Sequence, residues 1–307
     1  MAVEGNNIII RYLYRGEEGE IIPREATHIT VLARVILEQA FFKHPNIEEL
    51  ICDEDVEKVE ERAFYWCPYL RRVIMPGVKE VELEAFYGCR ALTYVECGKL
   101  QITGQCAFQL CRSLSGIDLP SIKVVGGRAF NGCRALVDAT FGKELESVGR
   151  GAIQDCTALE RITLPLKDGM MTNDNIFRWC KNLNHVDLIE GTILHETVAA
   201  LLWEEWKNDM NEEIDAINQN LARCDLGGKA QTIQTWIRSV LRKIVHYKAE
   251  HQRILDEAAT TLHHVLPNDI VLDSILSFLE LPSYTFEGEE EEESSDDESD
   301  DEEDEEE

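Results

Sequence analysis

The stretch AFYGCRALTYVEC (residues 85–97) carries the pattern that decides the fold of this chain. An Ala-Phe pair is followed at fixed spacing by a cysteine, a leucine and a valine, and similar phrases recur every 22 to 24 residues. One such copy cannot bury its own apolar face, so the period predicts stacked coils that share a continuous core. The copies begin at Ala40, Ala63, Ala85, Ala107, Ala129 and Ala152, with a degenerate copy at Ile176.

Apolar residues alternate within each copy, as in RRVIMP (71–76) and SGIDLP (115–120). This alternation predicts a short strand with one face inward, ended by the proline or glycine that follows. A second apolar pair, such as Val78 and Val81, predicts a second short strand in each coil.

The outward slots of the first strand should form two stripes across a sheet, and we predict that this face contacts a partner protein. A solvated polar face without a partner is the alternative. The predicted partner surface comprises Arg72, Ile74, Tyr94, Glu96, Asp118, Asp138, Thr140, Arg161, Thr163, His185 and Asp187.

The pattern LxxVxLPxxLxxVxxxAFxxC resembles the BspA-type leucine-rich repeat over residues 27–190, most clearly in AFYGCRALTYVEC, AFQLCRSLSGIDLP and AFNGCRALVDATF. The resemblance implies a right-handed solenoid and a protein-binding role, and it does not imply catalysis. QTIQTWIRSVLRKIVHYKAEHQRIL (residues 231–255) resembles a helical tail that follows such repeats in proteins of diatoms and related algae.

Six of the ten cysteines share one slot of the repeat, which could indicate metal or redox chemistry. Equal slots in stacked coils form a column with a spacing of about 4.8 Å. A tetrahedral zinc site instead needs four ligands that converge at about 2.3 Å, and the parallel Cβ vectors of a column disfavour disulfides. We therefore expect buried thiols that act as small hydrophobes, with no metal, cofactor or catalytic role. The column comprises Cys67, Cys89, Cys111, Cys133, Cys156 and Cys180.

These patterns predict an α+β chain in four parts. Residues 1–39 form a β cap and first coil, and residues 40–192 form the solenoid of about seven repeats. The apolar period then changes from two to about 3.6, so residues 193–282 are predicted to form a helical hairpin with a short third helix. Residues 283–307 form a disordered acidic tail, because they hold almost nothing apolar.

The charge of the chain is uneven. The net charge is −29, and residues 287–307 alone hold 17 carboxylates. The remaining body is also negative, so we expect no nucleic-acid binding, and the tail should favour basic partners. Three serines in this tail resemble acidophilic-kinase sites because each has an acid three residues later: Ser294, Ser295 and Ser299.

Several further expectations follow. No apolar run is long enough to span a membrane, and residues 1–20 do not resemble a secretory leader, so we expect an intracellular protein, cytoplasmic or nuclear.

The favoured function is a non-enzymatic scaffold that binds proteins through the exposed strand face. One alternative is a chaperone of histones or other basic proteins that uses the acidic tail. Another is an F-box-like ubiquitin-ligase adaptor that uses residues 266–281, although a helix packed on the hairpin is the favoured interpretation of that segment.

Overall fold

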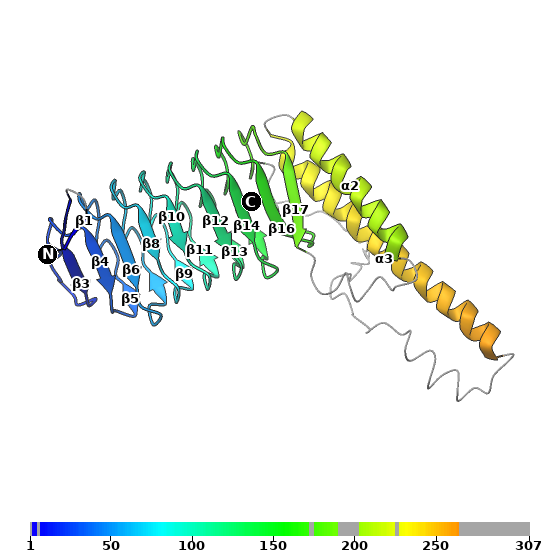
Figure 1. Ribbon diagram of the computed structural model, residues 1–307, viewed down its shortest axis with the longest axis horizontal. Helices are drawn as coiled ribbons and strands as arrows, with labels where there is room; N and C mark the ends of the chain where they lie inside the picture. Colours follow the sequence, from blue (N-terminus) through cyan, green and yellow to red (C-terminus); the bar gives the residue numbers. More distant parts are fainter. Residues whose placement is uncertain (1, 5–6, 172–174, 190–202, 225–226, 264–307) are drawn as a thin grey trace, which may run out of the picture.

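A computed structural model of the chain describes residues 2–4, 7–171, 175–189, 203–224 and 227–263 (Figure 1). It shows a parallel-strand solenoid that is followed by two helices, which confirms the fold class predicted from the repeat. A short antiparallel hairpin, β1 (Ala2–Glu4) with β2 (Asn7–Ile9), precedes the solenoid.

Each coil contributes one strand to the side of the solenoid that we call the front face, and all neighbouring pairs there are parallel. The front face consists of two sheets that meet between β10 and β12 (Figure 1). Its strands are β3 (Arg11–Tyr14), β4 (His28–Val31), β6 (Glu49–Cys52), β8 (Arg72–Ile74), β10 (Tyr94–Glu96), β12 (Gly116–Leu119), β14 (Asp138–Phe141), β16 (Arg161–Pro165) and β17 (His185–Ile189).

A second, two-residue strand per coil builds one unbroken six-stranded parallel sheet, here called the back sheet. The predicted second strand of each coil is thus present in six consecutive coils. Its members are β5 (Val35–Ile36), β7 (Lys58–Val59), β9 (Glu80–Val81), β11 (Ile102–Thr103), β13 (Val124–Val125) and β15 (Ser147–Val148).

The core between the two faces consists of columns of identical or similar apolar residues. The phenylalanines of the Ala-Phe pairs stack face to face, with ring centroids 4.6 Å apart for Phe41 and Phe64 and 5.1 Å apart for Phe64 and Phe86. Leucine, valine and cysteine columns are likewise buried along the solenoid. Because each coil offers its neighbour the same shape, the core continues from coil to coil without a change of packing.

The turn at the end of each Ala-Phe phrase uses a left-handed residue, which directs the next side chain into the core. The residue before the cysteine slot has a positive φ in every coil, and glycine, the residue that tolerates this conformation best, occupies only two of these positions. The left-handed residues are Lys43, Trp66, Gly88, Leu110, Gly132, Asp155 and Trp179.

Two helices, α2 (Trp203–Arg223) and α3 (Lys229–His263), form an antiparallel pair that covers the last coil beside β17 (Figure 1). Asn218 of α2 accepts a hydrogen bond from the Val186 amide at 3.2 Å. The buried Lys229 ammonium donates to the Leu183 carbonyl, and burial lowers the pKa of this lysine. These contacts pair polar groups at the last coil that the structure describes.

Some expectations concern residues outside the described ranges. They include the acidic tail of residues 283–307, its serines Ser294, Ser295 and Ser299, and the F-box-like segment 266–281. No helix among the described residues combines the length and the apolar character needed to cross a membrane.

Candidate functional site

The predicted partner residues form two columns on the front face, as the strand register shows. In the first column Arg72 lies beside Tyr94, and Asp138 lies beside Arg161 and then His185. In the second column Ile74 lies beside Glu96, while Asp118, Thr140, Thr163 and Asp187 follow one another. Ile74 is half-buried, and the exposed aliphatic residues of its column are Leu13 and Ile51, which were not predicted as partner residues.

Ion pairs and a cation–π contact between neighbouring strands fix several side chains of the first column. Glu49 lies between two basic groups, 3.6 Å from the His28 ring and 3.8 Å from the Arg72 guanidinium. The same guanidinium lies 5.5 Å from the centre of the Tyr94 ring, within cation–π range.

The second sheet of the front face shows similar pairing near its C-terminal end. Asp187 accepts hydrogen bonds from Arg161 at 3.1 Å and interacts with His185 at 3.0 Å. Both sheets of the front face therefore hold ion pairs, and a partner that docks on them meets side chains already fixed by one another.

The middle of the front face differs, because the backbone ladder is interrupted between β10 and β12. Elsewhere the ladder is regular: Tyr94 N–H donates to the Arg71 carbonyl at 3.2 Å, and Met75 N–H donates to the Glu96 carbonyl at 2.9 Å. Within the described residues no equivalent backbone bond joins β10 to β12. Gly116 opens β12, and a glycine weakens a strand because it adds no side-chain packing.

Side-chain exposure agrees with this interruption. Val95 and Ile117, the inward residues of the two strands, are 9% and 5% exposed, whereas Val73 and Ile162 in uninterrupted pairs are fully buried. A groove of about 570 Å³ follows the interruption, and we call it the seam groove. The side chains that define it are Tyr94, Glu96, Ser115, Asp118, Asp138 and Thr140.

The seam groove is acidic. Within the described residues no lysine, arginine or histidine forms an ion pair with Glu96, Asp118 or Asp138, and Glu96 accepts one hydrogen bond from the Tyr94 hydroxyl at 3.2 Å. Tyr94 itself is 47% exposed, so its ring forms an accessible wall. Burial, and then the nearby Asp118 and Glu96 carboxylates, raise the pKa of Cys97 below the groove to about 12.

The cysteine column lies on the inside of the turns, and its thiols are hydrogen-bonded to the backbone. Each thiol donates to a carbonyl of the preceding coil, as Cys67 does to Phe41 at 3.1 Å and Cys180 does to Ile153 at 2.9 Å. Burial raises the pKa of Cys67 and Cys133 to about 12, so these thiols are protonated and poor nucleophiles at neutral pH. The thiols of the column are therefore structural groups.

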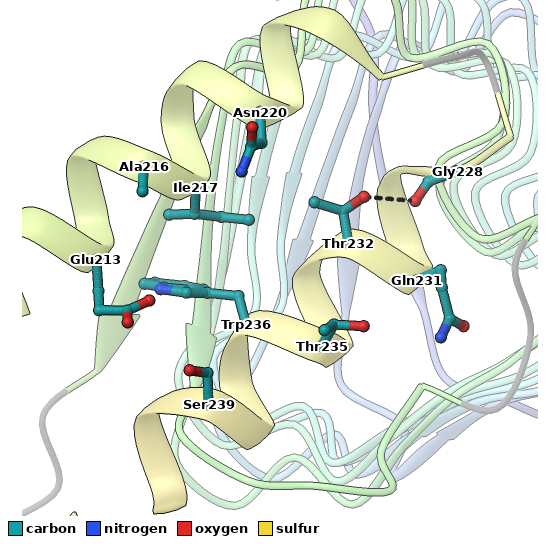
Figure 2. A pocket seen from close by; sticks show the side chains of 10 residues that line it. All are labelled: Glu213, Ala216, Ile217, Asn220, Gly228, Gln231, Thr232, Thr235, Trp236 and Ser239. Carbon is teal, nitrogen blue, oxygen red and sulfur yellow. Dashed lines mark hydrogen bonds between the residues drawn. The ribbon is translucent and has the colours of Figure 1, made fainter. Parts of the chain in front are cut away.

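A second groove, of about 550 Å³, lies between α2 and α3 and was not foreseen from the sequence (Figure 2). The Trp236 ring and Ile217 face each other across it, and Thr232 donates to the Gly228 carbonyl at 3.0 Å (Figure 2). The Trp236 Nε1 atom is buried and, among the described residues, has no hydrogen-bond partner. Glu213 on its rim is held by Lys243 at 3.0 Å, so the groove is part of the contact between the helices.

The structure thus divides the predicted partner residues into two groups. Five of them meet at the seam groove: Tyr94, Glu96, Asp118, Asp138 and Thr140. The other six lie along the same face outside the groove: Arg72, Ile74, Arg161, Thr163, His185 and Asp187. The one sequence signal for the groove was Gly116, a glycine in an outward strand slot.

Comparison with solved structures finds several leucine-rich repeat proteins that are similar to this chain. The leucine-rich repeat protein of T. pallidum is 27% identical, with 53% of this chain and 70% of that chain covered and a TM-score of 0.40. The repeat protein of Bacteroides ovatus is 21% identical over 55% of this chain and 53% of that one, with a TM-score of 0.38. The repeat protein of Eubacterium ventriosum is 18% identical over 53% and 55%, with a TM-score of 0.42.

No sequence among the curated proteins matches this chain. The model of the BspA type leucine rich repeat region matches residues 34–122 and 101–198 in six copies, which together span more than half of the chain. These matched residues include the solenoid coils from β5 to β17 and the whole cysteine column. The chain therefore belongs to the family of BspA-type leucine-rich repeat proteins.

Proposed function

We propose that this chain is a non-enzymatic scaffold that binds a partner protein through the front face. The observation that carries the proposal is the interruption at the centre of that face. Repeat packing fixes the backbone on both sides, while the seam groove leaves Tyr94 accessible beside free carboxylates. A rigid surface with an exposed aromatic anchor and few mobile parts loses little conformational entropy on binding.

The rest of the molecule supports a binding role. The back sheet consists of six two-residue strands, whereas the front face has nine strands of three to five residues, and the α2–α3 pair covers the C-terminal end of the stack. Among the described residues the front face is therefore the more extensive of the two strand surfaces. The six thiols of the cysteine column are buried and hydrogen-bonded to carbonyls, so they are not accessible nucleophiles. Membership of a repeat family that forms interaction surfaces agrees with this role.

Site-specific photocrosslinking tests the proposal. A benzoylphenylalanine residue would replace Tyr94 on the front face or, as the matched control, the exposed Ile102 on the back sheet of the full chain. Each variant is irradiated in an extract of the cells that express the chain, and the adducts are identified by mass spectrometry. We expect one protein to crosslink reproducibly from position 94 and not from position 102. Equal adducts from both positions, or none from position 94, would contradict the proposal.

A further inference from the structure

We propose that the seam groove binds the arginine or lysine side chain of an extended, basic segment of the partner protein. This inference rests on the proposed function and adds the chemistry of the ligand. The groove lies between β10 and β12, and its polar side chains are Tyr94, Glu96, Asp118 and Asp138.

The open ladder favours an extended ligand. Successive residues of a strand direct their N–H and C=O groups to opposite sides, so the register places the Gly116 and Asp118 amides on the side of β10. Within the described residues the Gly116 amide donates no hydrogen bond to the Thr93 carbonyl, and no ladder joins Asp118 to β10. Gly98 and Gly116 add no side chain along the groove, which leaves room for the backbone of a bound peptide. Main-chain hydrogen bonds of this kind give affinity for extended peptides.

The charge of the groove selects a cation. Glu96, Asp118 and Asp138 line the groove from three consecutive coils. Among the described residues, none of these three carboxylates takes part in an ion pair of the front face. Arg161, the register neighbour of Asp138, is already bonded to Asp187. A guanidinium or ammonium group that entered the groove would form charge-assisted hydrogen bonds with these carboxylates, and its apolar stem would lie along the Tyr94 ring.

The same charges argue against two other occupants. Residues 287–307 of this chain hold 17 carboxylates and no lysine or arginine, so like charges repel that segment from the groove. A second copy that presented its own seam groove would bring the two sets of carboxylates together, which is also unfavourable. A basic segment of a different protein is the occupant that complements the surface.

Binding of a defined peptide tests the inference. The probe is a fluorescein-labelled decapeptide of alternating glycine and arginine, and its control has citrulline, the neutral isostere, at each arginine. Fluorescence anisotropy is measured with the full chain at physiological ionic strength, so that the acidic tail contributes equally to every variant. The groove variant is D118N/D138N. The matched control is E144Q/E146Q, which removes two exposed carboxylates from a turn away from the groove.

We expect the groove variant to weaken binding of the arginine peptide by about tenfold or more, because two charge-assisted bonds are lost. The control variant should change the affinity less than about twofold, since exposed charges contribute little. Gly116→Val should also abolish binding to the groove, because its side chain fills the space and valine favours strand pairing. Equal affinities for the two double variants, or equal binding of the citrulline peptide, would overturn the inference.

The two proposals can fail separately. If a partner crosslinks from position 94 but its affinity is unchanged by D118N/D138N, the cation site is wrong and the front face remains the docking surface. If the arginine peptide binds the groove but no protein crosslinks from position 94, the groove has the inferred chemistry and the scaffold proposal is wrong.

Discussion

The Cys111 thiol donates a hydrogen bond to the Phe86 carbonyl of the preceding coil, 3.3 Å away. The same relationship links every cysteine of the column to the coil before it, at distances between 2.9 and 3.3 Å. A repeated cysteine therefore joins consecutive coils by a side-chain bond to the backbone, in addition to the strand ladders.

Removing this bond should destabilise the solenoid. Cys111→Ala deletes the donor and leaves the Phe86 carbonyl with one bond fewer, whereas Cys52→Ala deletes a buried thiol that has no hydrogen bond among the described residues. We expect the free energy of unfolding to fall further for Cys111→Ala, by about 0.5–1.5 kcal/mol relative to Cys52→Ala. Urea denaturation followed by circular dichroism measures the difference. Equal losses would show that the bond adds nothing to packing.

The column should also make stability sensitive to alkaline pH. The pKa of Cys67 and Cys133 is raised to about 12 in the folded chain, against 9.0 for an unburied thiol. Above pH 9 the unfolded chain releases protons that the folded chain keeps, so stability is complete below pH 9 and is lost as the pH rises towards 12. We expect a loss of about 1–2 kcal/mol per thiol at pH 10. A double C67A/C133A variant should show a shallower pH slope, and an unchanged slope would contradict this assignment.

His44 occupies the cysteine slot in the first coil and gives the opposite pH dependence. Burial lowers the pKa of His44 below 6.5, and the Pro23 carbonyl lies 3.0 Å from its Nε2 atom. The unfolded chain binds the proton first, so stability is complete above pH 6.5 and falls as the pH drops below it. We expect His44→Cys, which inserts the residue of the other coils, to flatten the dependence of the melting temperature between pH 5 and 7. A slope equal to that of the wild type would exclude His44 as its source.

Two glycines provide a matched test of how closely the coils approach. A Cβ atom at Gly142 would lie 1.8 Å from the Pro120 carbonyl oxygen, whereas a Cβ at Gly98, in the equivalent turn of an earlier coil, meets nothing within 4 Å. Gly142→Ala should therefore destabilise the fold by about 1–3 kcal/mol through a forced backbone shift. Gly98→Ala should stay within about 0.5 kcal/mol of the wild type. Similar melting temperatures for the two variants would contradict the tight approach at Gly142.

Most of the fold was predictable because the repeat specifies it redundantly. Phe86 and Phe108 occupy the same slot 22 residues apart, and identical slots in a solenoid must stack, as their rings do at 5.1 Å. The helical hairpin was predictable from the change of apolar period and from opposite charges, and Lys243 of α3 does meet Asp209 of α2 at 3.4 Å.

The seam groove was not predictable, because it depends on how two coils are oriented and not on which slots they fill. Gly116 occupies an outward slot like the other residues of its column, and its neighbours Ile117 and Leu119 follow the repeat. Only the ladder itself shows that β12 pairs with β14 and not with β10. The docking of the helices on the last coil was not predictable either. It depends on hydrogen bonds of Asn218 and Lys229, which the apolar period of the helices does not indicate.

Amide hydrogen exchange at the seam tests the central claim most directly. In the free chain we expect the Gly116 and Asp118 amides, which face the open ladder, to exchange faster than the Asp138 and Thr140 amides in the paired strand β14. The glycine–arginine peptide should then slow the exchange of Gly116 and Asp118 and leave Asp138 and Thr140 unchanged. If all four amides are equally protected in the free chain, or if the peptide protects none of them, the front face has no open groove that takes a basic segment.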